Sequence, residues 1–304
     1  MDFTIIILTY NEEKNILDCI DSFAGITSKI LVVDSFSTDQ TISLITQRNI
    51  KYLQHKFENY SKQRNWSQAN NPFQTEWVFH IDAGERATPN LVQWLKTIQN
   101  IPVEVAGFMF SRQTYFLGRW IRYGGHYPNY HLRLFKVSQG KCEDKAYDQH
   151  FVVEGKTQSV PNADMIDFAA DNIQSFTVKH SKWALMEAIE LIKQGQAGEV
   201  KASLKGSPIE QRRWLKNNLF QKMPIFLRSI AYFIYRYFFK MGFLDGKEGL
   251  IFHLLQGFWF RFLIDSLVFE ITYEMEKQQT DLHTVLKNTY QWDLKPSTHP
   301  NSNE

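Results

Sequence analysis

Three short apolar runs near the start of the chain constrain the fold most, because each of them ends abruptly in polar residues. The runs cover residues 3–8, 30–33 and 77–81. Buried parallel strands are continuous apolar runs, and open α/β sheets bind ligands beyond the carboxyl ends of such strands. The pattern therefore predicts one ligand site at one edge of a sheet, with acidic groups suited to a metal-bound nucleotide.

Segments with helical periodicity separate these runs. The predicted strands are residues 3–8, 29–33, 50–55, 77–81 and 105–110, and the predicted helices are residues 11–23, 37–49, 60–69 and 88–98. Residues 37–40 have the form of a capping box, and Thr88 with Pro89 supplies an N-cap and a first-turn proline. The alternation predicts an α/β fold with a mainly parallel sheet flanked by helices.

Composition and charge narrow the class of protein. The chain has 304 residues and a net charge of +2, so its charge gives no argument for a nucleic-acid partner. Its two cysteines, Cys19 and Cys142, lack metal-ligand spacing and are too few for a disulfide framework. The first apolar run is too short for a secretory signal and stops at Asn11. These features favour a cytoplasmic protein with reduced thiols.

Two short carboxylates stand at strand ends, Asp34 and Asp82. One could accept hydrogen bonds from a base or ribose, and the other could hold Mg²⁺ or Mn²⁺, which prefer oxygen ligands and bridge phosphates. The alternative is that both are turn or cap residues, since Asp is favoured in both places. Their combination with the polar segment 9–12 favours the ligand site.

These motifs resemble those of family 2 of the inverting glycosyltransferases, whose fold is of the GT-A type. The segment Thr-Tyr-Asn-Glu occupies residues 9–12, and Val-Asp-x-x-Ser-x-Asp-x-Thr occupies residues 33–41. The family's Asp-Ala-Asp-Glu element stands here as residues 82–85, with Gly84 in place of the second acid. The resemblance covers the first ~110 residues, and the lipopolysaccharide-core and O-antigen transferases are the members it suggests.

The resemblance implies a donor site for a nucleoside-diphosphate sugar, formed by residues at the strand ends. It places Thr9, Glu12 and Asp34 at a uridine or similar nucleoside, and Asp82 at the ribose and diphosphate. The substrate-binding residues predicted in this half are Thr9, Tyr10, Glu12, Asp34, Ser35, Asp82 and Ala83.

The same element predicts the metal site, which is Mg²⁺ or Mn²⁺ held by Asp82 and Glu85. Gly84 replaces the acid that usually binds the cation, so three outcomes stay open. Glu85 substitutes with altered geometry, Asp82 holds the metal alone, or cation binding is weakened. A solvated ion pair between Glu85 and Arg86 is the alternative role for Glu85.

The acceptor half, residues 111–170, must supply a base for the acceptor hydroxyl. Asp148 is the first candidate and Asp144 the second, because residues 148–151 occupy the region where family members carry a His-Glu or similar acid. An ordinary surface loop is the alternative. The predicted binding residues of this half are Arg112 and Arg133, which can neutralise the diphosphate, and His150, which can orient the base or bind the acceptor.

The remaining chain is basic and aromatic. The expected organisation is a GT-A type domain over residues 1–170, with its donor half at 1–110, a helical membrane-associating region at 171–294 and a disordered tail at 295–304. Residues 250–271 are long enough to span a bilayer, but charged side chains on one face favour a helix lying on an anionic membrane surface. A helix pair packed on the catalytic domain is the other alternative.

The leading hypothesis is an inverting glycosyltransferase on the inner face of the cytoplasmic membrane. It would move a sugar from a nucleoside diphosphate, UDP in the first place, to a lipid-linked or lipopolysaccharide-type acceptor. A sugar-1-phosphate nucleotidyltransferase is a weaker alternative, because residues 9–14 contain no glycine for its phosphate loop. A non-catalytic nucleotide-sugar or membrane-binding protein of the same fold is the third. No oligomeric state is predicted.

Overall fold

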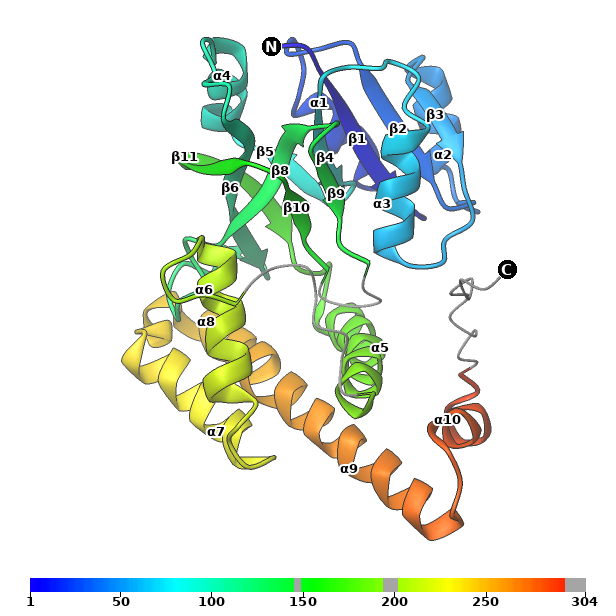
Figure 1. Cartoon of the computed structure of the whole chain (residues 1–304), viewed down its shortest axis with the longest axis vertical. Helices are drawn as coiled ribbons and strands as arrows, with labels where there is room; N and C mark the ends of the chain where they lie inside the picture. The colour runs from blue at the N-terminus through cyan, green and yellow to red at the C-terminus, as the bar shows by residue number, and fades with distance from the viewer. Residues whose placement is uncertain (145–148, 194–201, 293–304) are drawn as a thin grey trace, which may run out of the picture.

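A single large sheet organises the N-terminal part of the chain (Figure 1). The structure is a computed structural model, and it describes residues 1–144, 149–193 and 202–292. In spatial order the strands are β3 (Lys51–Gln54), β2 (Ile30–Asp34), β1 (Phe3–Thr9), β4 (Trp77–Asp82), β8 (Tyr130–Lys136), β6 (Val105–Phe116), β11 (Lys156–Phe168) and β5 (Glu85–Ala87). A short strand, β7 (Arg119–Trp120), pairs with β6, and β9 (Gly140–Cys142) pairs with β10 (Phe151–Val153) in a second small sheet.

The donor half of the sheet follows the predicted parallel order. Strands β3, β2, β1 and β4 are parallel to one another. Beyond β4 the sheet is mixed, because β8 lies antiparallel between β4 and β6. The connection from β6 to β8 contains β7, which folds back onto β6, and its described residues form no crossover helix. Strand β8 therefore returns antiparallel to β6. The predicted strand 105–110 is therefore part of the sheet but not a direct neighbour of β4.

Helices cover both faces of this sheet, as continuous apolar strands require. On β1, Ile5 and Ile7 face α1 (Ile16–Asp21), α2 (Thr41–Gln47) and α4 (Pro89–Thr97). The alternate residues Ile6 and Leu8 face the opposite cluster, which includes Trp66 of α3 (Tyr60–Ala69). The period of two along one strand thus supplies both layers of the core.

The predicted capping box at residues 37–40 is wrong. Helix α2 begins at Thr41 with Gln40 as its N-cap, and no side chain caps it. The Ser37 hydroxyl instead donates to the Asp34 carboxylate and accepts from the Asn11 amide. The Ser37 oxygen would have to accept from the helix backbone to cap it, and it accepts from the Asn11 amide instead.

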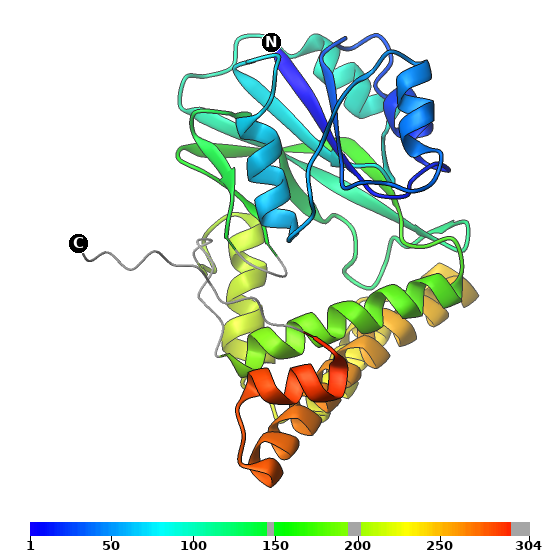
Figure 2. The same cartoon turned by 90° about the vertical axis from the view of Figure 1, so that its right-hand side faces the viewer.

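The described residues of the C-terminal part form helices between Ile173 and Tyr290, and Figure 2 shows the first helix lying between the sheet and the last helices. The α-helices are α5 (Ile173–Ile192), α6 (Pro208–Leu215), α7 (Leu227–Ile234), α8 (Gly246–Phe252), α9 (Phe260–Gln278) and α10 (Leu282–Tyr290). Three segments are π-helical, η1 (Lys216–Phe220), η2 (Tyr235–Phe239) and η4 (His253–Trp259), and η3 (Gly242–Asp245) is a 3₁₀-helix. Ala184 and Ala188 of α5 pack on Phe260 and Ile264 of α9.

Candidate active site

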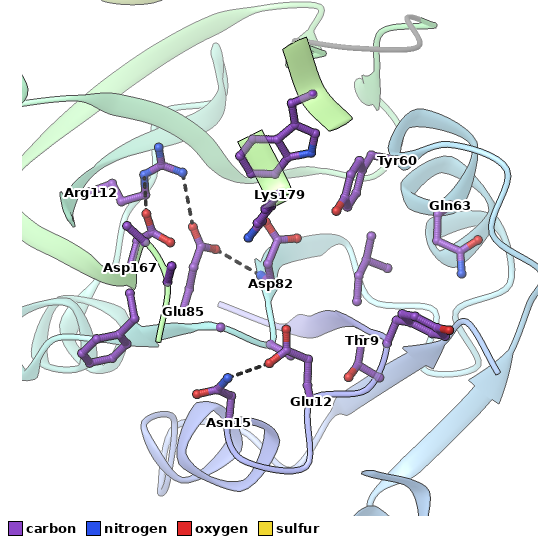
Figure 3. A pocket seen from close by; sticks show the side chains of 18 of the residues that line it. Thr9, Glu12, Asn15, Tyr60, Gln63, Asp82, Glu85, Arg112, Asp167 and Lys179 are labelled. Atoms are coloured by element: carbon purple, nitrogen blue, oxygen red, sulfur yellow. Dashed lines mark hydrogen bonds and ion pairs between the residues drawn. The ribbon is translucent and has the colours of Figure 1, made fainter. Parts of the chain in front are cut away.

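The polar ends of the parallel strands open onto one cleft of about 1380 Å³ (Figure 3). Register explains why they meet: Leu8 of β1 lies opposite Asp82 of β4, and Thr9 lies opposite Asp34 of β2. The predicted site residues that line the cleft are Thr9, Tyr10, Glu12, Ser35, Asp82, Ala83, Glu85, Arg112, Arg133 and His150. Asp34 and Asp144 are not among the lining residues, and Asp148 lies outside the described residues.

Asp34 lies beneath the cleft wall and is fully buried. Its carboxylate accepts hydrogen bonds from the Ser37 amide at 3.0 Å, the Ser37 hydroxyl, and Gln54 Nε2 at 3.0 Å. These partners make Asp34 the organiser of the turn that carries Ser35 into the cleft. Its direct contact with a nucleoside stays a prediction.

Three polar side chains line the cleft where β1 and β2 end, namely those of Thr9, Glu12 and Ser35. The Thr9 hydroxyl is buried and has no hydrogen-bond partner within the described residues. Glu12 accepts from Asn15 Nδ2 at 2.7 Å, and the Ser35 hydroxyl accepts from Gln63 Nε2 at 3.2 Å. A hydroxyl without a partner at a cleft wall can pair with a polar ligand, because leaving it unpaired costs free energy.

Asp82 is held between two guanidinium groups. Arg64 Nη2 lies 3.4 Å from both carboxylate oxygens, and Arg133 Nη1 lies 3.8 Å from one of them. Burial works to raise the pKa of Asp82, but the charges of Arg64 and Arg133 outweigh it, so the pKa is lower than its ordinary value. Asp82 is therefore a carboxylate at neutral pH, and more than a third of its side chain is exposed to the cleft, at 38%.

Glu85 has a different environment, although it is only three residues away. Its side chain is buried, and Arg133 Nη2 donates to Oε1 at 2.7 Å. The Asp82 amide donates to Oε2 at 3.1 Å, and Arg112 Nη1 lies 4.0 Å from Oε1. Burial raises the pKa of Glu85, while Arg133 works against that rise. Both oxygens of the Glu85 carboxylate therefore accept hydrogen bonds from groups of the protein itself.

The donor set of this element can therefore supply one ligand to a divalent cation. Asp82 is exposed to the cleft, whereas Glu85 is committed to Arg133 and Gly84 has no side chain. No group of three His, Cys, Asp or Glu side chains suited to a metal exists among the described residues. A single carboxylate still fits Mg²⁺ or Mn²⁺, because such ions often take one or two carboxylates together with phosphates and water.

The acceptor half brings a carboxylate that sequence reasoning missed. Asp167 of β11 lines the cleft, and Arg112 Nε lies 3.6 Å from it. Asp144 is exposed outside the cleft. The adjacent Glu143 is buried and accepts from the His150 backbone amide and from Arg213. Arg213 Nη2 also lies 3.0 Å from Nδ1 of His150, which holds the imidazole in place.

Two further cleft residues were also missed. Arg64 belongs to α3, where the buried positions are Ser61, Gln63 and Ser67, so no apolar periodicity marked that face. Lys179 belongs to α5 and lines the cleft opposite the strand ends. The sequence offered one signal for Arg64 and Lys179, which is that charged residues recur at helical spacing in both helices. The same pattern is typical of a helix face exposed to solvent.

Comparison with known proteins relates the matched part of the chain to a family of glycosyltransferases. Residues 4–150 match the family described as glycosyl transferase family 2. The chain is 24% identical over 198 residues to the lipopolysaccharide core biosynthesis glycosyltransferase LpsC of Rhizobium meliloti, a match that covers 62% of this chain and 72% of that protein. It is 32% identical over 85 residues to the uncharacterized glycosyltransferase RT0209 of Rickettsia typhi, covering 28% of each chain.

Solved structures of similar shape include two transferases. One is S. aureus TarS 1–349 in complex with UDP-GlcNAc, at a TM-score of 0.39 and 13% identity, covering 92% of this chain and 93% of that chain. The other is the mannosyltransferase PcManGT of Pyrobaculum calidifontis in complex with GDP-Man and Mn²⁺, at 0.45 and 13%, covering 92% and 88%. The family match over residues 4–150 includes the strands that build the cleft, so this part of the chain belongs to glycosyl transferase family 2, with sugar transfer from a nucleotide sugar as its class of activity.

Proposed function

We propose that the chain transfers a sugar, with inversion, from a UDP-linked donor to a lipid-linked or lipopolysaccharide-type glycan. The observation that supports this best is the cleft at the strand ends. There Asp82 stands beside the guanidinium groups of Arg64 and Arg133, and Arg112 lines the same cleft beside Glu85. Arginines bind phosphate oxygens in a planar, bidentate manner, so this arrangement suits a leaving diphosphate. The 24% identity with the lipopolysaccharide core transferase supports the acceptor class.

In this reaction the acceptor hydroxyl oxygen forms a bond to the anomeric carbon while the bond from that carbon to the diphosphate breaks. The hydroxyl proton passes to a carboxylate of the protein, and the nucleoside diphosphate leaves with the negative charge. The guanidinium groups of Arg64 and Arg133 oppose that charge in a site where burial strengthens electrostatic interactions. When bound at Asp82, Mg²⁺ or Mn²⁺ would supply further positive charge to the diphosphate.

We propose Asp148 as the base, with Asp144 as the second candidate and Asp167 as the carboxylate that the cleft itself adds. Each is replaced by Asn, which keeps size and removes the proton acceptor. The base variant should lose turnover by roughly 10² or more, with donor affinity little changed. Normal turnover in all three variants would show that the acceptor side has been misassigned.

The donor assignment is tested with Asp82→Ala. Binding of UDP-glucose, UDP-GlcNAc and GDP-mannose is measured by calorimetry, and donor hydrolysis is followed in parallel. The variant should keep its fold and lose hydrolysis by at least about 10²-fold, whereas Asp21→Ala, an exposed carboxylate paired with Arg48, should behave as the unmodified protein. A folded Asp82→Ala protein with full donor affinity and turnover would refute the proposal. Donor binding without any turnover in the unmodified protein would favour the non-catalytic alternative.

We further propose that the C-terminal helices hold the protein on the inner face of the cytoplasmic membrane. The continuous helical stretch Gly242–Gln278 is long and apolar enough to cross a membrane, and about a third of its most apolar window, 33%, is buried inside the protein. Asp265 in this stretch is buried and paired with Arg228 of α7. Since α9 also packs on α5, attachment from the surface is favoured over a span.

A further inference from the structure

The cleft extends beyond the donor strand ends to residues of β6, β8, η4 and helix α5, and α5 forms one of its walls. Phe176, Lys179 and Trp183 line the cleft at spacings of three and four, so they share one face of the helix. The opposite face is occupied, because Ala184 and Ala188 pack on α9. Phe176 is buried among other rings, whereas Lys179 is exposed and Trp183 is half-buried, so Lys179 and Trp183 are the side chains of α5 available to a ligand.

Polar atoms without partners gather at this end. Within the described residues, six lining side chains have a buried nitrogen or oxygen with no hydrogen-bond partner, two of which are Thr9 and Arg112. The other four atoms are Thr114 Oγ1, His126 Nε2, His131 Nε2 and Gln256 Oε1. They come from β6, the loop before β8, β8 itself and η4. Thr114 is only 4% exposed. Since buried polar groups in folded proteins are nearly always paired, such a group of atoms indicates a polar ligand.

The protonation of the two imidazoles adds to the argument. Arg236 Nη2 lies 2.9 Å from His126 Nδ1, and a guanidinium can only donate, so Nδ1 accepts and the proton of the neutral ring is on Nε2. Burial first, and nearby arginines second, hold the pKa of His126 and of His131 well below the ordinary value. Both rings are therefore neutral at pH 7 and can pair with hydroxyl groups.

Apolar rings lie beside these atoms. The Phe252 ring lies 4.9 Å from that of His126 and 6.3 Å from that of Phe176, which connects the loop before β8 to α5. Trp183 is half-buried on the same face of α5. A sugar ring presents hydroxyls at its edge and C–H groups on its faces, so it matches a wall of this kind better than an ion or a purely apolar group does.

We propose that this end of the cleft is the acceptor pocket, in which Thr114, His126, His131 and Gln256 bind the hydroxyls of a sugar residue and Trp183 stacks on its face. Lys179 at the rim binds a phosphate group carried by the acceptor. Its ammonium lies 4.9 Å from the centroid of the Trp183 ring, and no ion pair to it is found among the described residues. The pocket rests on the proposed function, because it presumes a donor at the opposite strand ends.

The test is saturation-transfer NMR on the full chain with methyl glycosides of glucose, galactose and mannose, and with glucose 6-phosphate. At least one glycoside should bind, and the sugar phosphate should bind more tightly than the matching glycoside. Thr114→Val keeps the shape and removes one hydroxyl. It should weaken binding of every probe by about fivefold, the usual value of one hydrogen bond, without lowering the melting temperature. Wild-type affinity, or a lowered melting temperature, in Thr114→Val would overturn the proposal.

The lysine has a matched control on the same helix. Lys179→Gln should abolish the preference for the sugar phosphate, whereas Lys182→Gln, which is exposed and does not line the cleft, should keep it. Competition by farnesyl diphosphate would assign the phosphate to a lipid anchor, and competition by glucose 6-phosphate alone would assign it to the sugar. An unchanged preference in Lys179→Gln refutes the role of the lysine.

Failure of this inference can be told from failure of the proposed function. Nucleotide sugars that bind to a protein giving no saturation transfer to any glycoside would refute only the acceptor pocket. Glycosides that bind to a protein with no affinity for nucleotide sugars would instead refute the donor assignment.

Discussion

At the scale of single residues, two neighbouring acids have opposite roles. Asp82 is open to the cleft, and Glu85 is buried against Arg133 at 2.7 Å. Removing one partner of a buried ion pair leaves an uncompensated charge in the protein, whereas a carboxylate that serves a ligand contributes little to the fold. The structure therefore separates a site for ligands from a site for stability within four residues of sequence.

Glu85→Ala should accordingly destabilise the protein, by about 3 to 5 kcal/mol, because Arg133 loses its buried partner. Asp82→Ala should lower the free energy of unfolding much less, because Asp82 is 38% exposed and its partner Arg64 lies farther away, at 3.4 Å. Urea unfolding of both variants measures the difference. Equal destabilisation by the two substitutions would contradict the separation of roles.

Gly84 leaves space beside Asp82, since no heavy atom lies within 4 Å of the place where a Cβ would stand. Gly84→Asp therefore introduces a second acid without a clash, and it should raise Mn²⁺ affinity in the presence of UDP by about tenfold or more. Calorimetric titration of Mn²⁺ measures this. Gly84→Asn is the matched control of equal size, and equal affinities in the Asp and Asn variants would count against a cation at this element.

At the scale of elements, a buried carboxylate fastens α6 to the small sheet of β9 and β10. Glu143 accepts from Arg213 of α6 at 2.9 Å and from the His150 amide at 2.9 Å. Burial works to raise its pKa, but the hydrogen bonds from His150 and Arg213 outweigh it and lower the pKa of Glu143 to about 2. Since His150 lines the cleft, this contact also connects the helical region to the site.

The folded-state pKa of Glu143 is below its usual value of 4.5, so the stability that it contributes is fully present above pH 4.5 and is lost as the pH falls toward about 2. Glu143→Gln should lower the melting temperature at pH 7, and the difference from the unmodified protein should shrink between pH 4.5 and pH 3. Circular dichroism at several pH values follows this. Asp144→Asn, at the exposed neighbour, should have no such effect, and a gap that stays constant with pH would refute the linkage.

At the scale of the whole molecule, exposed apolar side chains gather on the helical region. Phe238 and Phe239 of η2 are 56% and 74% exposed, and Phe243 and Leu244 of η3 are also exposed. Lys240 stands between these two pairs. Contiguous exposed apolar groups with adjacent basic residues are typical of a protein surface that meets an anionic membrane.

A variant with Phe238→Ser and Phe239→Ser should sediment with vesicles of phosphatidylglycerol and phosphatidylethanolamine at least about tenfold less than the unmodified protein, since each buried ring contributes roughly 1.5 to 3 kcal/mol. Binding of the unmodified protein should also fall as salt rises. Val103→Ser is the control, because Val103 is 88% exposed and lies in the sheet domain. Equal sedimentation of the two variants would argue against this surface, and extraction by detergent alone would favour a spanning helix.

The sequence by itself determined the parallel half of the sheet, its helices and the convergence of the strand ends on one cleft. The helix at Tyr60–Ala69 was predicted with its observed bounds, β1 and β4 differ from prediction by one residue at one end, and β2 differs by one residue at both ends. These features are local, because the period of apolar residues and the polar break after each strand are written in consecutive positions. The cleft lining at Thr9, Glu12 and Asp82 follows from parallel register.

Only the tertiary structure decided which polar groups face the ligand and which face each other. It placed β8 antiparallel between β4 and β6, turned Glu85 toward Arg133 and buried Asp34 under the cleft wall. It also brought Arg64 and Lys179 into one cleft, although more than a hundred residues of chain separate them. The sequences of their helices mark neither residue as functional. Charge pairing and burial depend on contacts between distant segments, and those contacts exist only once the sheet and the helical region have packed together.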